Sequence, residues 1–526
     1  MILSAETNDP LVVIISNRGP FKFEPAEDGT FNIERGAGGL VTALAALVQK
    51  HDVLWAASAM SEGDRQWVQA HNGQIQNVDD IYLKLVTPDN DQYQKYYNII
   101  ANPLLWFIHH QLWDTVRDPS VTAEMWDAWR DGYVAINKLF ADTLAESLKD
   151  VKRPIVIMPQ DYHLYLVPKF LRQALGDDIQ IQPFLHIPWP GPDAWRILPG
   201  EMRVELLDSL LQADRIGFQT KKDAFNFVQT CRFYLSNAHS HGSRNSIEYN
   251  GRRVEAHDYP ISIDIERVKE LAEEPQTKLL KSQFINIVGD NQLILRVDRI
   301  EPSKNILRGL EAFKTLLTHY PEHRGSVKML ALLVPSRMEV NEYQDYLREI
   351  MAMTGLINAE FSDAFWEPVR VIVGDNYHRA LAAMQLYDVL LVNPLADGMN
   401  LVAKEGVLVN RKDGCLLLSE YAGAFYELSE HAMNLSPYDV YGTAEAMHEA
   451  LNMSAVERET RAAGLREIVE RADVRQWFAD QVADALRAFR SQAKKDSVPA
   501  TPAVSISAVS KTDAGVSVPE TPRFKT

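Results

Sequence analysis

The chain contains 526 residues, 46% of them hydrophobic and 24% charged, and carries a formal net charge of −17 at pH 7. One hydrophobic core stops growing near about 250–300 residues, so this length and composition predict a soluble globular protein of at least two domains. The acidic balance argues against nucleic acid or an anionic membrane surface as a partner, because both repel negative charge.

The two cysteines, Cys231 and Cys415, lie in apolar segments, and their spacing matches neither a zinc site nor a disulfide framework. The N-terminal segment MILSAETNDP has no basic stretch followed by a long apolar run, and nothing later approaches about 18 consecutive apolar residues. We therefore expect a cytoplasmic protein without a signal peptide, a membrane span or a metal.

Short apolar, β-branched runs alternate with helical patterns along the first half of the chain. We expect strands at LVVIIS (11–16), PIVIMPQD (154–161), IQPFLHIP (181–188) and RIGFQT (215–220). This alternation predicts parallel strands joined by crossover helices, which is an α/β layer structure.

A second series of apolar runs follows in the second half. Its expected strands are QLILRVDR (292–299), VKMLALLVP (327–335), VRVIVGD (369–375), VLLVNP (389–394) and GCLLLSE (414–420). Two such series in succession predict two Rossmann-like domains, which we place at residues 1–263 and 264–475. The join falls in YPISID (259–264), where Pro260 interrupts and Asp264 can cap a helix that begins at Ile265.

The C-terminal end changes character twice. Asp473 could cap a helix that carries Phe478, Val482, Leu486 and Phe489 on one face, and we expect residues 476–490 to pack back on the N-terminal domain. From 491 to 526 the chain is rich in Ser, Thr, Pro, Val and Ala, so we expect a disordered and dispensable tail.

In open α/β sheets, ligands bind beyond the carboxyl ends of the strands, so the residues after each strand are the first candidates for a site. Here these residues are mostly polar or charged. They are Arg18 after the first run, then Asp161, His186, the pair Arg299 and Lys304, Arg337 and finally Asp397.

The glycine-rich segment RGAGGL (35–40) follows a hairpin-like span and leads into a helix expected from Leu40. Gly38 and Gly39 could form only a turn, or the free N–H groups of that helix could face an anion such as a nucleotide-sugar phosphate. This segment alone leaves both interpretations open.

The stretch DGMNLVAKE (397–405) combines a Gly-Met-Asn corner with the start of a helix. Asn400, Leu401 and Val402 would present backbone N–H groups at the helix N-terminus, where negative charge is favoured. The corner therefore predicts a site for an anionic group.

Arg299 and Lys304 lie in VDRIEPSK (297–304) of the same half. An isolated pair of cations could simply be solvated. Beside the corner, each would add charge-assisted hydrogen bonds worth roughly 1.5–3 kcal/mol. Together they predict a cradle for a diphosphate, with Glu405 accepting from a ribose diol and Asp397 from sugar hydroxyls.

Ordered motifs over about residues 10–490 resemble those of the retaining trehalose-6-phosphate synthases, which are nucleotide-sugar glucosyltransferases. The matching motifs are SNR (16–18), AGGL (37–40), YYN (96–98), DYH (161–163), FLHIPWP (184–190), GFQT (217–220), R-x4-K (299–304), PSR (335–337), DGMNLVAKE (397–405) and AGA (422–424). The resemblance implies two Rossmann-like domains that face a cleft, the GT-B architecture. It also implies transfer of glucose from a nucleoside-diphosphate glucose to glucose 6-phosphate.

The resemblance assigns roles to positions of this sequence. On the donor side, Arg299 and Lys304 would hold the diphosphate, Glu405 the ribose, and Asp397 and His186 the glucose hydroxyls, with Gly38 and Gly39 closing over the donor and Asn400, Leu401 and Val402 at the helix start. The acceptor pocket would consist of Arg18, Tyr97, Trp106, Asp161 and Arg337. Arginines and a phenol suit a phosphate dianion, and an aromatic ring suits a sugar face.

The family reaction retains the anomeric configuration and is described as a front-face displacement, in which the leaving diphosphate takes the acceptor's proton. The resemblance implies Arg299, Lys304, His186 and Asp397 as the catalytic residues, with no cofactor and no metal. Stabilising the leaving group is then the main task, and loss of one preorganised donor typically costs about 10²–10³ in rate.

Four positions depart from the family pattern, one of them Trp189, which stands in HIPWP where a phenylalanine is usual. Gln160 stands where a histidine is usual, Asn305 where a glycine is usual, and Ser58 where many members have an acceptor-pocket tryptophan. The donor base (UDP or GDP), the acceptor beyond a phosphorylated sugar or polyol, and a homo-oligomeric state stay open.

Four alternatives to that transfer also remain: another phosphorylated acceptor such as glycerol 3-phosphate, a pseudo-glycosyl coupling, a non-catalytic sugar-phosphate sensor, and a glycoside hydrolase using Asp397 with a second carboxylate. The intact diphosphate cradle argues against the last two.

Overall fold

The computed structural model describes residues 9–36, 51–240, 242, 245–338 and 340–496, without the side chains of Asn341 and residues 488–496. Gly38, Gly39 and the helix expected from Leu40 lie outside these residues. By their contacts, the described residues up to Leu486 form one unit, and those from Arg487 onward belong to a second.

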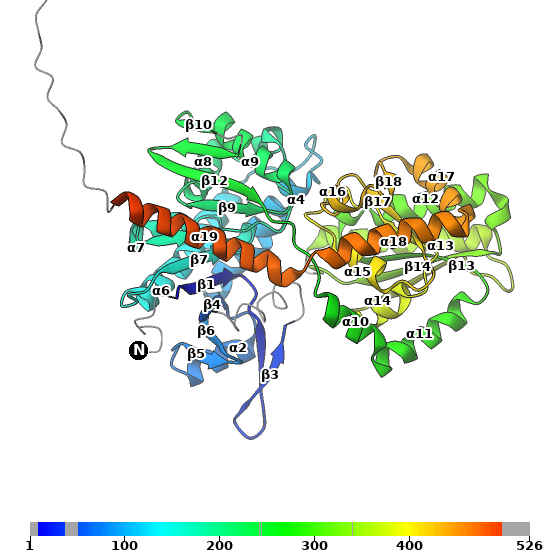
Figure 1. Cartoon of the computed structure of the whole chain (residues 1–526), viewed down its shortest axis with the longest axis horizontal. Coiled ribbons are helices and arrows are strands. Elements are labelled where there is room, and N and C mark those ends of the chain that lie inside the picture. The colour runs from blue at the N-terminus through cyan, green and yellow to red at the C-terminus, as the bar shows by residue number, and fades with distance from the viewer. Residues whose placement is uncertain (1–8, 37–50, 241, 243–244, 339, 497–526) are drawn as a thin grey trace, which may run out of the picture. The chain divides into compact units, whose positions relative to one another are not determined.

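The first half is built on a six-stranded sheet in the order β5-β6-β4-β1-β7-β8, in which β1 pairs in parallel with β4 and β7. Its central strands are apolar and buried along their whole length, as expected of a sheet covered on both faces. Figure 1 shows β6, β4, β1 and β7 side by side. The strands are β1 (Leu11–Ser16), β4 (Val53–Ser58), β5 (Gln76–Val78), β6 (Ile81–Val86), β7 (Ile155–Pro159) and β8 (Ile179–Ile181). Of these, β4, β5 and β6 were not among the expected strands.

The strand expected over residues 181–188 is wrong. β8 ends at Ile181, and beyond it only Phe184 makes isolated parallel bridges, to Gln160 and to Gly217. Pro183 and Pro188 lack the N–H that a sheet requires, which explains why this run does not continue as a strand. The two bridges connect the first sheet to a second one, in the order β10-β11-β12-β9.

The remaining elements of the first half surround these sheets. The second sheet and the β2–β3 hairpin comprise β2 (Phe21–Pro25), β3 (Phe31–Arg35), β9 (Arg215–Phe218), β10 (Ala238–Ser240), β11 (Ser246–Tyr249) and β12 (Arg252–Asp258). The helices are α2 (Glu62–Ala70), α3 (Asn90–Gln94), η1 (Lys95–Leu105), α4 (Trp106–His110), α5 (Ala123–Asp127), η2 (Ala128–Val134), α6 (Ala135–Leu148), η3 (Tyr162–Leu164), α7 (Val167–Leu175), η4 (Pro192–Ile197), α8 (Gly200–Leu210) and α9 (Lys221–Tyr234).

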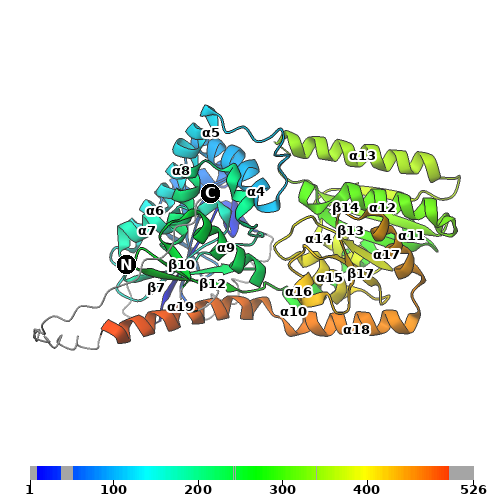
Figure 2. The ribbon, with the colours of Figure 1, turned by 90° about the horizontal axis from the view of Figure 1, so that it is seen from above.

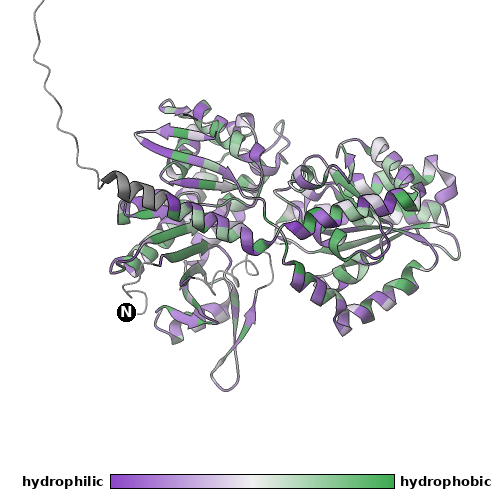
Figure 3. Ribbon diagram, in the orientation of Figure 1, coloured by the Kyte–Doolittle hydropathy of each residue, from purple (hydrophilic) through white to green (hydrophobic). Residues whose placement is uncertain are grey.

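The second half contains one all-parallel sheet in the order β15-β14-β13-β16-β17-β18. Residues of α12, α13 and α17 form the core on one face of this sheet, and residues of α10, α14, α15 and α18 lie in the core on the other. Figure 2 shows helices on both sides of β13, β14 and β17, and Figure 3 shows the hydrophobic colour concentrated along the strands. The α/β prediction with two Rossmann-like halves is therefore confirmed.

The strands of this half are β13 (Gln292–Arg299), β14 (Val327–Val334), β15 (Val369–Val373), β16 (Val389–Val392), β17 (Cys415–Ser419) and β18 (Met433–Leu435). Its helices are α10 (Ile265–Glu273), α11 (Pro275–Val288), η5 (Pro302–Lys304), α12 (Ile306–His319), η6 (Pro321–His323), α13 (Asn341–Phe361), α14 (Tyr377–Met384), α15 (Leu401–Val409), α16 (Phe425–Leu428), α17 (Val440–Asn452), α18 (Ala455–Arg471) and α19 (Val474–Asp496).

Two expected helix starts are confirmed by their caps. The Asp264 side chain accepts from the Arg267 N–H at 3.0 Å at the start of α10, and the Asp473 side chain accepts from the Arg475 N–H at 2.8 Å before α19. The division at residues 263 and 264 stays a prediction.

The last helix, α19, packs through its first turns on the first half. Trp477 Nε1 donates to the Tyr259 carbonyl at 2.8 Å, and the Tyr259 hydroxyl donates to Asp484 at 2.7 Å. α19 also runs on to Asp496, so the expectation of disorder is wrong for residues 491–496. Their sequence, SQAKKD, contains good helix formers, which accounts for the extension. None of the helices in the described part of the chain combines the length and apolar character needed to cross a bilayer.

Candidate active site

The polar residues at the strand ends of both halves line a shared cavity of about 790 Å³. It lies where the carboxyl ends of parallel strands place ligands in such folds. The expected site residues that line it are Arg18, Tyr97, Asp161, His186, Arg299, Lys304, Arg337, Asp397, Asn400 and Leu401. A neighbouring cavity of about 270 Å³ shares six of these residues and adds Trp106.

The buried carboxylate of Glu301, which the sequence analysis did not single out, holds Arg299 and Arg337, the two arginines of the second half that line the cavity. Arg299 Nη2 lies 3.0 Å from Glu301 Oε2, Arg337 Nη1 contacts Oε1, and the Tyr343 hydroxyl donates to Oε1 at 3.2 Å. Glu301 is 0% exposed. Burial alone would raise its pKa, but Arg299, Arg337 and Lys304 outweigh that and lower the pKa of Glu301 to about 2. Glu301 is therefore a fixed anion that orients two cations.

The Arg337 guanidinium links the two halves. Its Cζ lies 3.9 Å from the centre of the Trp106 ring, within cation–π range, and its Nη2 donates to the Tyr162 hydroxyl at 3.3 Å. Arg337 adopts φ 46°, a conformation that non-glycine residues take at a cost of order 1–3 kcal/mol. The contacts of the guanidinium with Trp106 and Glu301 hold Arg337 in that conformation.

Lys304 and Asp397 form the other charged pair of the site. Lys304 Nζ lies 2.5 Å from Asp397 Oδ2, and Asn400 Nδ2 donates to the same oxygen at 2.9 Å. Burial raises the pKa of Asp397, but the Lys304 ammonium and the Asn400 amide outweigh it and hold that pKa below its usual value. Asn400 also caps α15, since its side chain accepts from the Ala403 N–H at 3.2 Å. The predicted corner is thus a capped helix start.

The glycine of this corner is required by a close approach between the halves. A Cβ on Gly398 would lie 1.9 Å from the carbonyl oxygen of His186. Only glycine lets the 397–400 corner reach the segment that carries His186.

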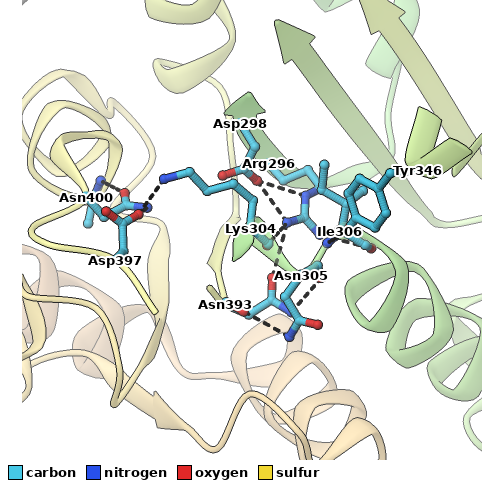
Figure 4. A network of polar contacts seen from close by, with 10 residues as sticks. Arg296, Asp298, Lys304, Asn305, Ile306, Tyr346, Asn393, Asp397 and Asn400 are labelled. Atoms are coloured by element: carbon cyan, nitrogen blue, oxygen red, sulfur yellow. Dashed lines mark hydrogen bonds and ion pairs between the residues drawn. The ribbon is translucent and has the colours of Figure 1, made fainter. Parts of the chain in front are cut away.

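A buried arginine of β13 supports the loop that presents Lys304. Figure 4 shows Arg296 between Asp298, Asn393 and the loop, and its Nη2 donates to the Lys304 carbonyl at 3.0 Å. Two further bonds, 2.8 Å to Asp298 Oδ2 and 3.2 Å to Asn393 Oδ1, fix the guanidinium. A Cβ on Gly309 would lie 2.2 Å from Arg296 Nη1, so a glycine in α12 leaves room for it.

On the side of the first half, burial disfavours the charged forms of Asp161, His163 and His186. Burial raises the pKa of Asp161 to about 7, despite hydrogen bonds from the backbone N–H groups of His186 and Tyr162 and the charges of Arg337 and Arg299. Burial lowers the pKa of His163 to about 3 and of His186 to about 4. Asp161 has φ 71°, and its side chain does not cap the helical turn that follows.

Aromatic rings form the wall beside Asp161. The Tyr97 ring stacks on His163 with centroids 5.8 Å apart and on Tyr93 with centroids 5.7 Å apart. Arg18 is exposed at the end of β1 and also lines the cavity. Arg18, Tyr97 and Arg337 thus share one cavity, although they are distant in sequence.

Four buried polar atoms around the two cavities have no hydrogen-bond partner within the described residues: Trp106 Nε1, His163 Nε2, Arg337 Nε and Glu301 Oε2, the last of which is held by its ion pair with Arg299. Buried polar groups are normally paired, so unpaired ones that line a cavity indicate where a polar ligand would bind.

Two predicted donor residues on α15, Val402 and Glu405, are not among the described residues that line the cavity. Glu405 instead accepts a hydrogen bond from the Tyr377 hydroxyl at 2.9 Å. Their donor roles stay predictions, as do those of Gly38 and Gly39.

A histidine pair outside the cavity has metal-ligand spacing. Glu322, His323 and His448 place their ligand atoms within 4.8 Å of one another. His448 Nδ1 already lies within hydrogen-bond distance of His323 Nε2, at 2.9 Å, and of Asn452 Nδ2, at 3.3 Å. Hydrogen bonds therefore account for the cluster.

The cavity brings together fixed cations, a capped helix start and neutral polar groups. Such cations can stabilise a phosphate-bearing leaving group, and neutral groups can hold hydroxyls. A family model described as "Glycosyltransferase family 20" matches residues 10–487. The chain belongs to glycosyltransferase family 20.

Individual members of the family support this assignment. "Trehalose-6-phosphate synthase" of Mycobacterium marinum is 33% identical over 492 residues, covering 90% of this chain and 94% of the relative. A solved structure described as "Trehalose-6-phosphate from E. coli bound with UDP-2-fluoro glucose" has a TM-score of 0.79 and 29% identity, covering 90% of this chain and 98% of that one. The UDP-forming alpha,alpha-trehalose-phosphate synthase of Burkholderia xenovorans, solved with glucose-6-phosphate, has a TM-score of 0.76 and 27% identity, covering 90% and 99%.

Sequence reasoning missed Glu301, Arg296 and Gln160 as parts of this family 20 site. The available signals were charged residues in unexpected places. Glu301 is an acid between the cations Arg299 and Lys304, and Arg296 interrupts the apolar strand LILRV. Gln160 was noted only as a departure from the family pattern.

Proposed function

We propose that this chain is a retaining glucosyltransferase that moves glucose from a nucleoside-diphosphate glucose, UDP- or GDP-glucose, to glucose 6-phosphate and forms α,α-trehalose 6-phosphate. The observation that carries the proposal is the single cavity that contains Arg299, Lys304 and Asp397 from one half and Arg18, Tyr97 and Asp161 from the other. A donor and a phosphorylated acceptor need such cation groups within reach of one another. The names of the family members at 27–33% identity support the same reaction.

In this proposal, residues 264–475 bind the donor. Arg299 and Lys304 stabilise the departing diphosphate, aided by the N–H groups at the start of α15, and Glu405 accepts from the ribose. Asp397 and His186 hold hydroxyls of the transferred glucose, and Gly38 and Gly39 close over it. The ion pair with Asp397 holds the Lys304 ammonium in place, which preorganises it for the diphosphate.

Residues 1–263 supply most of the acceptor pocket. Arg18, Tyr97 and Arg337 bind the phosphate, because two guanidinium groups and a phenol can donate several charge-assisted hydrogen bonds to a dianion. Trp106 and Asp161 flank the acceptor sugar. The departing diphosphate oxygen takes the proton of the attacking hydroxyl, so the reaction needs no dedicated base.

The test is direct. Purified protein is incubated with UDP-, GDP- or ADP-glucose and glucose 6-phosphate, and the sugar product is identified by mass spectrometry and NMR. We expect an α,α-linked disaccharide phosphate with at least one of the first two donors. Formation of a product only with glycerol 3-phosphate, or binding of donor without turnover on any acceptor, would overturn the proposal.

We also propose that the enzyme acts in the cytoplasm, because both cysteines are buried and free rather than paired. Fractionation of expressing cells, with the protein in the cytoplasmic fraction as the expected outcome, tests this.

A further inference from the structure

Gln160 follows β7, is 2% exposed, and uses both ends of its side-chain amide. Its Nε2 donates to the carbonyl of Met158 at 3.0 Å, and its Oε1 lies 3.0 Å from Nε2 of His186. A backbone carbonyl can only accept, so the amide NH₂ must face Met158 and the amide oxygen must face His186. The orientation of Gln160 is therefore determined by the fold.

That orientation determines the protonation of the His186 ring. An amide oxygen only accepts, so Nε2 of His186 must carry the hydrogen. Because burial lowers the pKa of His186 to about 4, the ring is neutral near pH 7 and its second nitrogen, Nδ1, bears a lone pair. Nδ1 has no hydrogen-bond partner in the part of the chain that the structure describes, and His186 lines both cavities.

The surroundings of the ring favour this neutral form. The rings of Phe184 and Trp477 pack against it, with centroids 4.7 Å and 5.9 Å away. Its cavities also contain the cations of Arg299, Lys304 and Arg337 and the carboxyl groups of Asp161, Glu301 and Asp397. Glu301 and Asp397 are already paired with those cations, and Asp161 accepts from the backbone N–H of His186 at 3.3 Å, so none of these three carboxyl groups makes an ion pair with the His186 ring.

We propose that Gln160 is a positioning residue that holds His186 as the Nε2–H tautomer, so that Nδ1 accepts a hydrogen bond from one hydroxyl of the donor sugar. The hydroxyl must then donate its hydrogen to Nδ1. A donor sugar that carries a group able only to accept hydrogen bonds at this position is a poor substrate. This inference rests on the proposed function for its substrate, but its tautomer component does not depend on activity.

The first experiment measures the tautomer. Long-range ¹H–¹⁵N correlation spectra of full-length protein with ¹⁵N-labelled histidine, assigned with His186→Gln, should show a pyrrole-type Nε2 and a pyridine-type Nδ1 for His186. Gln160→Met has similar length and no hydrogen bond, so it should change this pattern toward the other tautomer or a mixture. The matched control is Gln219→Met, which replaces another buried glutamine that lines the cavity but contacts the Ile261 N–H instead. Its His186 pattern should match the parent's.

The second experiment measures the polarity of recognition. Donors in which one glucose hydroxyl, at position 3, 4 or 6, is replaced by hydrogen or by fluorine are compared by kcat/KM. At one position both replacements should reduce kcat/KM of the parent by a similar factor of about 10–100, because fluorine cannot donate. In Gln160→Met the fluoro donor should recover relative to the deoxy donor at that position, since an Nδ1–H can donate to fluorine.

Distinct outcomes overturn distinct claims. A pyridine-type Nε2 in the parent, or an unchanged pattern in Gln160→Met, overturns the role of Gln160. Equal tolerance of fluorine in parent and variant at all three positions overturns the recognition by Nδ1. Absence of transfer by the parent with unmodified donors overturns the proposed function and leaves the tautomer result intact.

Discussion

On the first-half side of the cavity, burial shifts Asp161, His163 and His186 toward their neutral forms: the pKa of Asp161 is raised to about 7, and those of His163 and His186 are lowered to about 3 and 4. On the second-half side, equally buried carboxyl groups stay ionised, because Arg299, Arg337 and Lys304 compensate them and lower the pKa of Glu301 to about 2. Similar burial thus has opposite consequences. Neutral groups suit the exchange of hydrogen bonds with sugar hydroxyls, and paired charges suit a diphosphate.

The largest expected effect comes from removing the anion that organises the charged side. Glu301→Gln leaves Arg299 and Arg337 without their buried partner, and breaking such a pair typically costs about 3–5 kcal/mol. We expect a clear fall in Tm together with a loss of activity. Thermal unfolding checks this, with Asp345→Asn as control, because Asp345 pairs with Arg348 on the surface and such pairs contribute about 0–1 kcal/mol. Equal Tm changes in the two variants would contradict the role given to Glu301.

Arg299→Ala removes one cation of the diphosphate cradle but little packing, since the Arg299 side chain is 46% exposed. We expect kcat to fall by about 10²–10³ with a small change in Tm. Steady-state kinetics measure this, and Arg348→Ala, a surface arginine of α13, is the matched control. An unchanged kcat in Arg299→Ala would remove Arg299 from the site.

Arg337→Lys separates the effect of charge from that of hydrogen-bond geometry. It keeps a positive charge beside Glu301 but removes the planar guanidinium group. A lysine cannot make the paired hydrogen bonds of a guanidinium, so KM for glucose 6-phosphate should rise about 10-fold. The KM for the donor should change much less. If only the donor KM rose, the assignment of Arg337 to the acceptor would be wrong.

The two sides should also differ in the pH dependence of stability. The folded-state pKa of Asp161, about 7, lies above the ordinary value of 3.8 for an aspartate, so its stabilising contribution is present below about pH 4 and is lost as pH rises toward 7. The Tm of Asp161→Asn relative to the parent should therefore increase between pH 5 and 8, by about 2 °C or more. Glu301, with a lowered pKa, loses stabilisation only below about pH 4.5, so the Tm difference for Glu301→Gln should be flat over the same range. If the Tm differences of the two variants changed with pH in the same way, the proposed difference between Asp161 and Glu301 would be wrong.

The smallest expected effect concerns the chain after Asp496. Composition predicts that residues 497–526 are dispensable. Deleting them should leave kcat and Tm unchanged within error, whereas a deletion that starts at residue 474 removes Trp477 and its bond to Tyr259 and should lower Tm.

The sequence by itself determined which chemical groups are available and on which local elements they lie. Apolar runs with polar residues at their ends predicted most of the parallel strands and seven of the residues that line the cavity. DGMNLVAKE predicted the start of α15 with Asn400 and Leu401, whereas Tyr97 was implied only by the family resemblance. These features are local, since strand propensity and helix capping depend on neighbours a few positions away.

Only the tertiary structure decided how those groups are shared and which state they adopt. Arg299 and Arg337 meet at Glu301 because β13 and β14 are parallel neighbours with Arg299 opposite Val334, a register that no local pattern specifies. The tautomer of His186 depends on a glutamine 26 positions earlier, and the pKa values depend on burial. Desolvation and hydrogen-bond partners are properties of the assembled fold, so residue types alone could not have predicted them.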